Sequence, residues 1–345
     1  MKLPRVAVIG AGHLGRIHGR LARQGGCMDL VAIVDPMLES RRAMAEELGV
    51  AQHADCESLL GHLDAAIVAT PTIYHHQVAR DLLQHGIHTL VEKPLADSVP
   101  QAAELVEIAR DAGAVLQVGH VERFNPAWAA LGPEWNQVRY FEATRTSSYS
   151  FRSTDIGVVH DLMIHDLDLI LSRCPAPVVA VQASCVAVIG PHEDVAHARL
   201  EFADGRVALL RASRVSAKAE RTMQLYAAHG HAVVDFSAPG VTIVDRCSAL
   251  RQGRFDPQSI SPAERSQYQQ RLFEDVLPAT TLKLDPINAI AEEQVDFAAS
   301  IREGREPVVT GAQALRALRV AEQIVTVARV SAGITPSPVT LKPAA

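Results

Sequence analysis

The sequence has no long hydrophobic run, few cysteines and no excess of basic residues. No apolar stretch approaches the roughly 18–20 residues of a transmembrane helix, and the apolar segment 6–9 is too short to be a signal peptide. The five cysteines are scattered and form no CxxC motif, which favours reduced thiols over disulfide bonds or a zinc site. With 33 Lys and Arg against 39 Asp and Glu, and a net charge of −6, neither nucleic acid nor an anionic membrane is an expected partner. These absences together predict a cytoplasmic protein.

The composition is that of an ordinary globular protein. Of the 345 residues, 48% are hydrophobic and 21% are charged, and no internal repeat is visible. A chain of this length has room for two domains with substantial cores. Near residue 121 the pattern changes from alternating strands and helices to longer strands with hairpin signals, so we expect a domain boundary there.

The first third of the chain has the pattern of a parallel sheet with helices on both faces. Its expected strands are apolar with few polar alternates, which is typical of strands buried on both sides. Residues 1–121 are therefore predicted to form a doubly wound parallel sheet, the Rossmann arrangement of an α/β domain. The predicted strands are 5–9, 30–34, 64–69, 87–91 and 114–118, and the predicted helices are 13–24, 38–48, 74–85 and 99–112.

The remainder, residues 122–335, is predicted to be a second α/β domain with an open, largely antiparallel sheet. Asp204-Gly205 and His229-Gly230 each separate two strand patterns, as a hairpin turn does. The exposed face of such a sheet has to be covered by helices or by another subunit. The predicted strands are 137–148, 178–189, 198–202, 206–213, 223–228 and 231–236; a polar excursion follows at 251–282, then helices at 287–303 and 311–330, and a loose tail at 336–345.

A glycine-rich turn follows the first predicted strand. The apolar run 6–9 stops at Gly10, and Gly10-x-Gly12-x-x-Gly15 leads directly into a helical pattern. The free N–H groups of such a helix N-terminus suit a pyrophosphate, which comes close because Gly12 has no side chain. The second strand ends in Asp35, 20 residues after Gly15, where a carboxylate can accept hydrogen bonds from ribose hydroxyls. This context predicts a dinucleotide site; the alternative is a structural glycine turn in an ordinary βαβ unit.

The residues around Asp35 favour NAD over NADP. Its carboxylate would repel a 2′-phosphate, and the next residues, Pro36 and Met37, offer no cation. Arg41 and Arg42 lie a turn or more into the following helix, where we expect them to be solvated.

Two further strand ends carry candidate site residues, because a parallel sheet binds its ligand beyond the carboxyl ends of its strands. After the third strand, Thr70-Pro71-Thr72 leads into a helix that contains His75. The threonines are suited to capping that helix; alternatively, this loop packs against the ribose and nicotinamide of the cofactor. The fourth strand ends in Glu92-Lys93-Pro94, and a charged pair at the mouth of a buried strand favours a functional lysine over a surface one.

A candidate acid–base pair lies in the second domain. Helical spacing places Asp161 and His165 one turn apart on one face, so that the carboxylate can orient and polarise the imidazole. Such a histidine can take the hydroxyl proton when an alcohol is oxidised. One alternative is an ordinary Asp–His pair on a solvated helix face. Another is a metal site that also uses His160 and Asp166, but no three of the four residues share a face with ligand geometry, so no metal is expected.

Taken together, these motifs resemble one known family. GAGHLG at 10–15, ATPT at 69–72 with His75, EKP at 92–94 and Asp161-x-x-x-His165 occur in the order and at the separations of the glucose–fructose oxidoreductase/inositol dehydrogenase (Gfo/Idh/MocA) family. The resemblance implies NAD(P)-dependent oxidation or reduction of a sugar or cyclitol carbon, and a homodimer or homotetramer formed through the C-terminal sheet. It implies a cofactor site made of Gly10, Gly12, His13, Leu14, Gly15, Asp35, Thr70, Pro71, His75, Glu92, Lys93 and Pro94.

The resemblance also assigns catalytic roles. Lys93 would contact the nicotinamide ribose and the substrate hydroxyl, and the peptide bond before Pro94 would be cis. His165 would be the acid–base residue, and Asp161 beside it would hold the substrate or the imidazole. This assignment requires Lys93 and His165 to converge over the nicotinamide. His160 departs from the family pattern, which has small residues at that position, so its role stays open.

Two segments resemble a particular branch of the family. GHVERFNPA at 119–127 and DLMIHDLD at 161–168 are similar to members that oxidise UDP-N-acetylglucosamine at C3. This resemblance implies that Arg123, Asn125, Arg152 and Asp161 lie near the sugar or the diphosphate, although Asn125 followed by Pro126 is also a good helix start. The alternatives are inositol, a free aldose or a biliverdin-like tetrapyrrole as substrate, or an NAD-binding regulatory or partner protein that no longer turns over.

Overall fold

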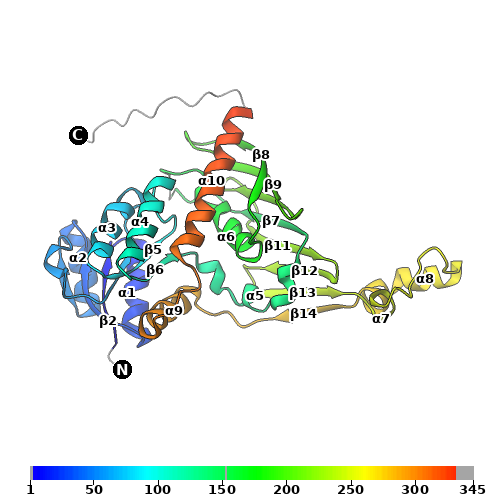
Figure 1. Cartoon of the computed structure of the whole chain (residues 1–345), viewed down its shortest axis with the longest axis horizontal. Helices are drawn as coiled ribbons and strands as arrows, with labels where there is room; N and C mark the ends of the chain where they lie inside the picture. The colour runs from blue at the N-terminus through cyan, green and yellow to red at the C-terminus, as the bar shows by residue number, and fades with distance from the viewer. Residues whose placement is uncertain (1–2, 152–153, 332–345) are drawn as a thin grey trace. The chain divides into compact units, whose positions relative to one another are not determined.

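The computed structural model describes residues 3–151 and 154–331, which form two compact units (Figure 1). The first unit takes the residues up to Glu134 together with Val234–Val241 and Leu282–Arg319, and the second takes Trp135–Val233, Thr242–Thr281 and the residues from Val320. Each unit is thus made of segments that are separate in sequence. The domain boundary near residue 121 stays a prediction. The predicted tail, 336–345, lies outside the described residues.

The first unit contains a six-stranded, all-parallel sheet in the order β3-β2-β1-β4-β5-β6. This is the predicted Rossmann arrangement, and its order reverses between β1 and β4, where such sheets bind dinucleotides. The strands are β1 (Arg5–Ile9), β2 (Asp29–Val34), β3 (Ala51–His53), β4 (Ala65–Val68), β5 (His88–Glu92) and β6 (Leu116–Gly119); the helices are α1 (His13–Gly25), α2 (Leu38–Leu48), α3 (Thr72–Gln84) and α4 (Val99–Asp111). The sequence reasoning missed β3, because this edge strand has three residues and none is buried.

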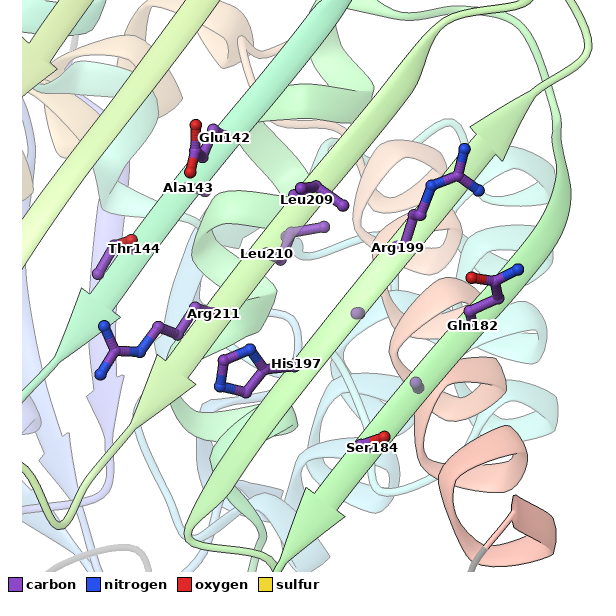
Figure 2. A pocket seen from close by; sticks show the side chains of 12 residues that line it. Glu142, Ala143, Thr144, Gln182, Ser184, His197, Arg199, Leu209, Leu210 and Arg211 are labelled. Atoms are coloured by element: carbon purple, nitrogen blue, oxygen red, sulfur yellow. The ribbon is translucent and has the colours of Figure 1, made fainter.

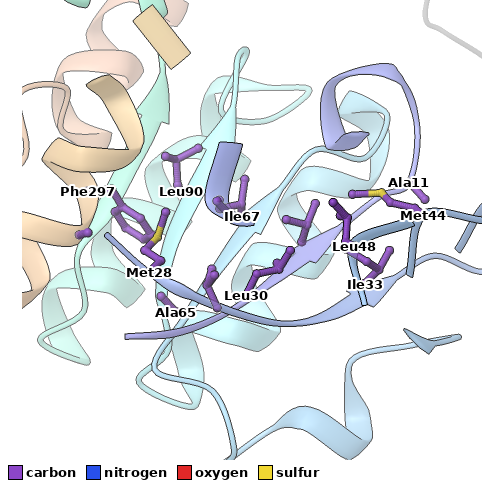
Figure 3. Packing of buried hydrophobic residues seen from close by; sticks show 14 of the residues in the cluster. Ala11, Met28, Leu30, Ile33, Met44, Leu48, Ala65, Ile67, Leu90 and Phe297 are labelled. Carbon is purple, nitrogen blue, oxygen red and sulfur yellow. The ribbon is translucent and has the colours of Figure 1, made fainter. Parts of the chain in front are cut away.

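The core of this unit includes a helix from far along the chain. Helix α9 (Ala289–Glu303) packs against α1 and the short helix η2 (Val121–Phe124). Its Phe297 is fully buried beside Met28, Leu30 and Leu90, which come from the sheet and the turn before β2 (Figure 3). The periodicity at 287–303 predicts this helix, but only the tertiary structure shows which sheet it covers.

The second sheet has eight strands and is mixed and mostly antiparallel, as predicted. Its order is β14-β13-β12-β11-β7-β10-β9-β8, with one parallel pair, β7–β10, among the pairs β7–β11, β7–β10, β9–β10 and β8–β9. Helix α6 (Ile164–Arg173) packs against β7. The strands are β7 (Tyr140–Thr146), β8 (Val178–Val186), β9 (Val195–Phe202), β10 (Val207–Ser213), β11 (Glu220–Ala227), β12 (Gly230–Asp235), β13 (Gly240–Asp245) and β14 (Ala279–Lys283).

Strands of this sheet bury one face and leave the other open. In β9, Ala196, Ala198, Leu200 and Phe202 are buried, whereas the alternate residues point to the other face. Figure 2 shows the open face, where His197, Arg199 and Arg211 project from neighbouring strands. The second sheet is therefore open on one face, as predicted, and this face is a broad polar and apolar surface on the unit.

Part of the predicted loop at 251–282 is regular. It contains α8 (Pro262–Gln270) and β14, and β13 before it was also missed. Helix α8 begins with a capping box, in which Ser261 Oγ accepts from Glu264 N at 3.3 Å and Glu264 Oε2 accepts from Ser261 N at 2.8 Å. The spacing of a serine and a glutamate three residues later is a sequence signal for a helix start, which the polar composition of the segment obscured.

Two further features bear on the expected class of protein. No helix in the described part of the chain is long and apolar enough to cross a membrane. All five cysteines are described and none is in a disulfide bond. Burial raises the pKa of Cys56 and Cys185 to about 11, so these thiols are protonated and unreactive at neutral pH.

Candidate functional site

The phosphate loop depends on two glycines for its shape. Gly10 has a φ of +102°, and a Cβ there would lie 2.6 Å from the carbonyl oxygen of Ala69 in the neighbouring loop. A Cβ on Gly15 would lie 1.8 Å from the carbonyl oxygen of Gly10. Neither position can carry a side chain without displacing backbone.

Gly12 differs because nothing lies within 4 Å of the position its Cβ would take. It is the N-cap of α1, and no described side chain caps this helix end. The next two residues, His13 and Leu14, are exposed. The fold therefore does not need a glycine here, whereas a pyrophosphate at the helix N-terminus does.

Asp35 follows β2 and fits the ribose end of a dinucleotide. The N–H of Ala11 donates to Asp35 Oδ2 at 2.7 Å, and the N–H of Met37 donates to Oδ1 at 2.8 Å. These bonds hold the half-buried carboxylate against the phosphate loop, and each oxygen keeps lone pairs for ribose hydroxyls. The residues of this loop therefore fit a dinucleotide.

Replacing Asp35 by serine is expected to weaken NAD binding by about 10–100-fold, because hydrogen bonds to a charged group contribute about 1.5–3 kcal/mol each. The discrimination against NADP should fall at the same time, since the charge that repels a 2′-phosphate is gone. Fluorescence titration with both cofactors measures this change. Glu39→Gln, which removes an exposed acidic group from the first turn of α2, is the control and should leave both affinities near those of the wild type.

The loops after β4 and β5 are joined through His75. Its Nδ1 lies 2.9 Å from the carbonyl oxygen of Pro94, and its Nε2 lies 2.8 Å from that of Thr70. Burial lowers the pKa of His75, although both carbonyls and Glu92 act in the opposite direction. A neutral imidazole donates to only one of the two carbonyls, and a contact between His75 and the cofactor stays a prediction.

The Thr70–Pro71 loop supports a ligand interpretation. The capping alternative for its threonines is wrong, because Pro71 is the N-cap of α3 and no side chain caps it. Thr70 Oγ1 is buried without a hydrogen-bond partner among the described residues. A buried hydroxyl in this state suits a bound polar group. The peptide bond between Lys93 and Pro94 is cis, in agreement with the implication of the resemblance.

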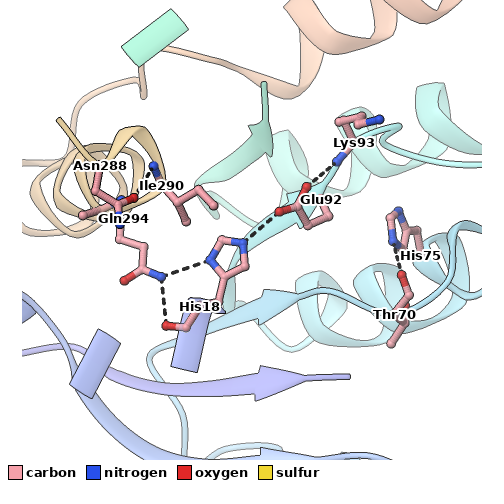
Figure 4. A network of polar contacts seen from close by, with 9 residues as sticks. His18, Thr70, His75, Glu92, Lys93, Asn288, Ile290 and Gln294 are labelled. Atoms are coloured by element: carbon pink, nitrogen blue, oxygen red, sulfur yellow. Dashed lines mark hydrogen bonds and ion pairs between the residues drawn. The ribbon is translucent and has the colours of Figure 1, made fainter. Parts of the chain in front are cut away.

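Glu92, the residue before Lys93, belongs to a buried polar network (Figure 4). Its Oε1 lies 2.8 Å from His18 Nε2, and its Oε2 accepts from the backbone N–H of Lys93 at 3.2 Å. Gln294 Nε2, from α9, lies 3.0 Å from both His18 Nδ1 and the His18 carbonyl oxygen. The sequence reasoning missed His18 and Gln294. A histidine three residues after Gly15, on the sheet-facing side of the predicted helix, was the available signal.

A second buried glutamate, Glu293, adjoins this network. It has no exposed surface, and its two carboxyl oxygens have no hydrogen-bond partner among the described residues. Burial, followed by the negative charges of Glu92 and Asp296, raises the pKa of Glu293 well above its ordinary value. Burial therefore favours the protonated, uncharged form of this side chain.

This protonation makes the stability of the protein depend on pH. Glu293 keeps its proton in the folded state but loses it in the unfolded state above a pH near 4.5. The stabilisation from this group is therefore complete below that pH and decreases as pH rises. In Glu293→Gln the contribution is absent, so the Tm of the variant relative to the wild type should rise from about pH 5 to about pH 8. Glu292→Gln, at the exposed neighbouring position, should show no such trend in thermal melts.

Asp161 and His165 lie in the second unit, at a junction of two helix types. Asp161 is in a π-helical turn, η4 (Val159–Met163), and His165 is in the first turn of α6. Both side chains are half-buried, so they do not form a fully solvated helix face. The spacing predicts a regular helix, whereas the structure has a wider turn of the kind that is frequent at functional sites.

Neighbouring elements hold this junction. Arg145 of β7 makes a buried, bidentate ion pair with Asp166, with N–O distances of 2.8–3.2 Å. Glu193 accepts from the backbone N–H of Val158 through its carbonyl oxygen at 2.8 Å. The Glu193 carboxylate lies against Gly157, where a Cβ would be 1.9 Å from Oε1. His160 is half-buried in the same turn, and no group of three possible metal ligands exists among the described residues.

The predicted substrate residues have different positions. Arg123 donates to the carbonyl oxygen of Val308 at 3.1 Å and to Gln313 Oε1 at 3.0 Å. Asn125 is buried; its Oδ1 caps α5 (Pro126–Ala129) through Ala127 N, and its Nδ2 donates to Glu122 and Phe236. Asn125 thus caps this helix, as the sequence also suggested. Arg152 lies outside the described residues, and substrate contacts by the other two stay predictions.

Two family models match the chain. Residues 4–120 match the model described as "Oxidoreductase family, NAD-binding Rossmann fold", and residues 117–233 match that of the GFO/IDH/MocA C-terminal domain. The two matches cover the first sheet and strands β7 to β11 of the second, and they include the predicted glycine, EKP and Asp–His motifs.

Individual relatives agree with these matches. UDP-N-acetylglucosamine 3-dehydrogenase of Acidithiobacillus ferrooxidans is 37% identical over 233 residues, which are 67% of this chain and 74% of the relative. Its solved structure superposes with a TM-score of 0.81 at 31% identity, covering 96% of this chain and 99% of that one. The NAD-dependent scyllo-inositol 2-dehydrogenase of Bacillus subtilis is 29% identical over 231 residues, covering 61% of this chain and 68% of the relative.

Proposed function

The chain belongs to the GFO/IDH/MocA family of NAD-binding oxidoreductases, and on this basis we propose that it oxidises a ring hydroxyl of a nucleotide sugar, UDP-N-acetylglucosamine at C3. The observation that carries the choice of substrate is the 37% identity to the A. ferrooxidans enzyme named for this reaction. The loop around Asp35 supports NAD as the cofactor, because its carboxylate opposes a 2′-phosphate.

In the proposed mechanism, His165 and Lys93 act on the substrate hydroxyl, and Asp161 orients the imidazole or the substrate. When bound, NAD supplies the nicotinamide carbon that accepts a hydride. His165 takes the proton of the substrate hydroxyl as general base, and Asp161 orients the imidazole or the substrate. Lys93 stabilises the negative charge that develops on the substrate oxygen. The thiols of Cys56 and Cys185 stay protonated at neutral pH and have no role in this mechanism, and the five cysteines, none of which is in a disulfide bond, support a reducing compartment such as the cytoplasm.

A substrate panel tests the proposal. The purified protein is mixed with NAD and, in separate reactions, with UDP-N-acetylglucosamine, UDP-glucose, myo-inositol, glucose and biliverdin, the last with NADH. NADH formation with UDP-N-acetylglucosamine alone, and identification of a 3-keto product by mass spectrometry, is the expected result. Turnover of inositol, glucose or biliverdin instead would assign the chain to another branch. Tight NAD binding without turnover of any compound would favour a regulatory or partner protein.

We also propose that the open face of the second sheet joins copies of the chain into a homodimer or homotetramer. An exposed sheet face of this size needs a cover, and Leu209 lies among charged side chains there (Figure 2). Leu209→Arg is expected to shift the molar mass measured by light scattering towards the monomer. Leu38→Arg, at an exposed leucine of α2, is the control; a wild-type monomer at micromolar concentration would refute the proposal.

A further inference from the structure

The buried network around Glu92 connects three segments that are distant in sequence. His18 comes from α1, Glu92 ends β5 and Gln294 comes from α9, and all three are nearly or fully buried. Polar side chains in a core cost free energy unless they are fully paired. Because this network is centred on Glu92, directly before the proposed catalytic residue Lys93, we consider whether it serves catalysis.

The hydrogen bonds determine which ring nitrogen of His18 accepts and which donates. The carbonyl oxygen of His18 can only accept, so the Gln294 group that lies 3.0 Å from it is the amide nitrogen. The same nitrogen donates to His18 Nδ1 at 3.0 Å, which must therefore carry a lone pair. The imidazole proton is then on Nε2, which donates to Glu92 Oε1 at 2.8 Å. Nε2 of His18 is thus the donor that holds the Glu92 carboxylate.

The other oxygen of Glu92 is directed to the lysine. Glu92 Oε2 accepts from the backbone N–H of Lys93 at 3.2 Å. The neighbouring strand leaves room for this oxygen, because Glu92 pairs with Gly119 of β6, and a Cβ on Gly119 would lie 2.8 Å from Oε2. Each carboxylate oxygen of Glu92 therefore accepts one hydrogen bond, and the missing side chain of Gly119 leaves space for Oε2.

The charged groups around Glu92 act in opposite directions. Burial raises its pKa, but the interaction with His18, followed by the positive charge and the backbone N–H of Lys93, outweighs this effect and lowers it overall. His75, from α3, also faces this charge and is kept neutral by burial. From α9, Glu293 faces it as a neutral acid. Of the two neighbouring buried glutamates, one is thus an anion and the other is protonated.

We propose that His18 and Gln294 are positioning residues for Lys93: they hold Glu92 as an anion whose second oxygen orients the Lys93 peptide and so aims the ammonium group. The proposal rests on the catalytic role proposed for Lys93. The proposed positioning role requires the negative charge of Glu92. A purely structural role would require only that these side chains pack in the core.

Kinetics against pH test the proposal. His18→Leu removes the donor to Glu92, so Glu92 is expected to take up a proton and release Lys93; kcat should fall by about 10–100-fold at pH 6 and recover partly towards pH 9. The KM for NAD should change by less than about threefold, because the phosphate loop and Asp35 are untouched. His18→Gln, which keeps an amide N–H for Glu92, should restore most of the lost kcat at low pH. Glu293→Gln is the matched control and should leave the pH profile unchanged, since it replaces a neutral acid by a neutral amide.

A second measurement does not depend on the substrate. In protein with 13C-labelled glutamate carboxyls, the resonance missing from Glu92→Gln identifies Glu92, and its titration should move to higher pH in His18→Leu. If His18→Leu does not fold, Gln294→Leu should show a smaller shift in the same direction. An unchanged titration of Glu92, or a loss of kcat that is equal at every pH, would overturn the proposal. If the wild type turns over none of the panel compounds, the proposed function fails while the titration still tests the network.

Discussion

Replacing Lys93 by methionine, or His165 by alanine, is expected to lower kcat by about 10²–10⁴-fold while leaving the Kd for NAD within about threefold of the wild type. Lys93 is a cationic donor at the end of β5, and His165 is the proposed general base of α6. Their interactions are made chiefly with the reacting oxygen and its proton, so their loss affects the transition state more than cofactor binding. Stopped-flow detection of NADH gives kcat, and calorimetric titration gives Kd.

The two variants should differ in their dependence on pH. Hydroxide can partly replace a missing general base, so the activity of His165→Ala should increase more steeply at alkaline pH than that of Lys93→Met. Lys283→Met, at an exposed lysine of β14, is the control for loss of a positive charge. Turnover within threefold of the wild type in either variant would remove that residue from the mechanism.

Gly15→Ala is expected to lower the thermal stability, whereas Gly12→Ala is expected to weaken NAD binding and leave the thermal stability unchanged. In Gly15→Ala the new Cβ meets the backbone oxygen of Gly10 at 1.8 Å, so the phosphate loop has to move and the Tm should fall by several degrees. In Gly12→Ala the Cβ enters open space, so the Tm should stay near that of the wild type. The Kd for NAD should nevertheless rise by at least about tenfold, because the methyl group occupies the approach of the pyrophosphate.

Differential scanning fluorimetry with and without NAD separates the two effects. The wild type should be stabilised by NAD, and Gly12→Ala should lose this stabilisation while its melting without NAD is unchanged. Gly190→Ala, at another glycine with open space around the Cβ position and without a positive φ, is the control for an added methyl group alone. If Gly12→Ala bound NAD as tightly as the wild type, the pyrophosphate would not lie on this helix end.

Local patterns were sufficient for the first sheet and its cofactor loop. The glycines, Asp35 and the EKP segment lie at strand ends, and five of the six strands contain an apolar run of buried residues. The alternation of buried and exposed residues similarly predicts strands such as β9 in the second sheet. Strands without such a pattern were missed, as in β3, whose three residues are not buried, and β14, whose five residues are all exposed.

The candidate catalytic residues were found by a different route. Asp–His spacing alone does not distinguish a functional pair from a surface pair, and the resemblance of the motifs to a family made the difference. The structure adds that Asp161 lies in a π turn and that Asp166 is tied to Arg145 by a buried ion pair. A π turn depends on the packing of the surrounding sheet and loop, so helical periodicity cannot reveal it.

Asn125 followed by Pro126 is a motif that suits two roles, a helix cap and a sugar-binding residue. The sequence suits both a helix cap and a ligand of the sugar, and the structure uses both its oxygen and its nitrogen within the fold. Only coordinates can separate these meanings, because both need the same side chain before the same proline.

The sequence by itself determined the cofactor-binding half of this protein, since a strand, a glycine turn, a helix and an acidic residue interact over a few tens of residues and leave a local pattern. The tertiary structure alone decided which buried polar groups meet. Glu92 is 74 residues from His18, and His18 is 276 residues from Gln294. Hydrogen bonds across such separations form only after the sheet and α9 have packed, and that packing selects which buried glutamate remains an anion and which keeps its proton.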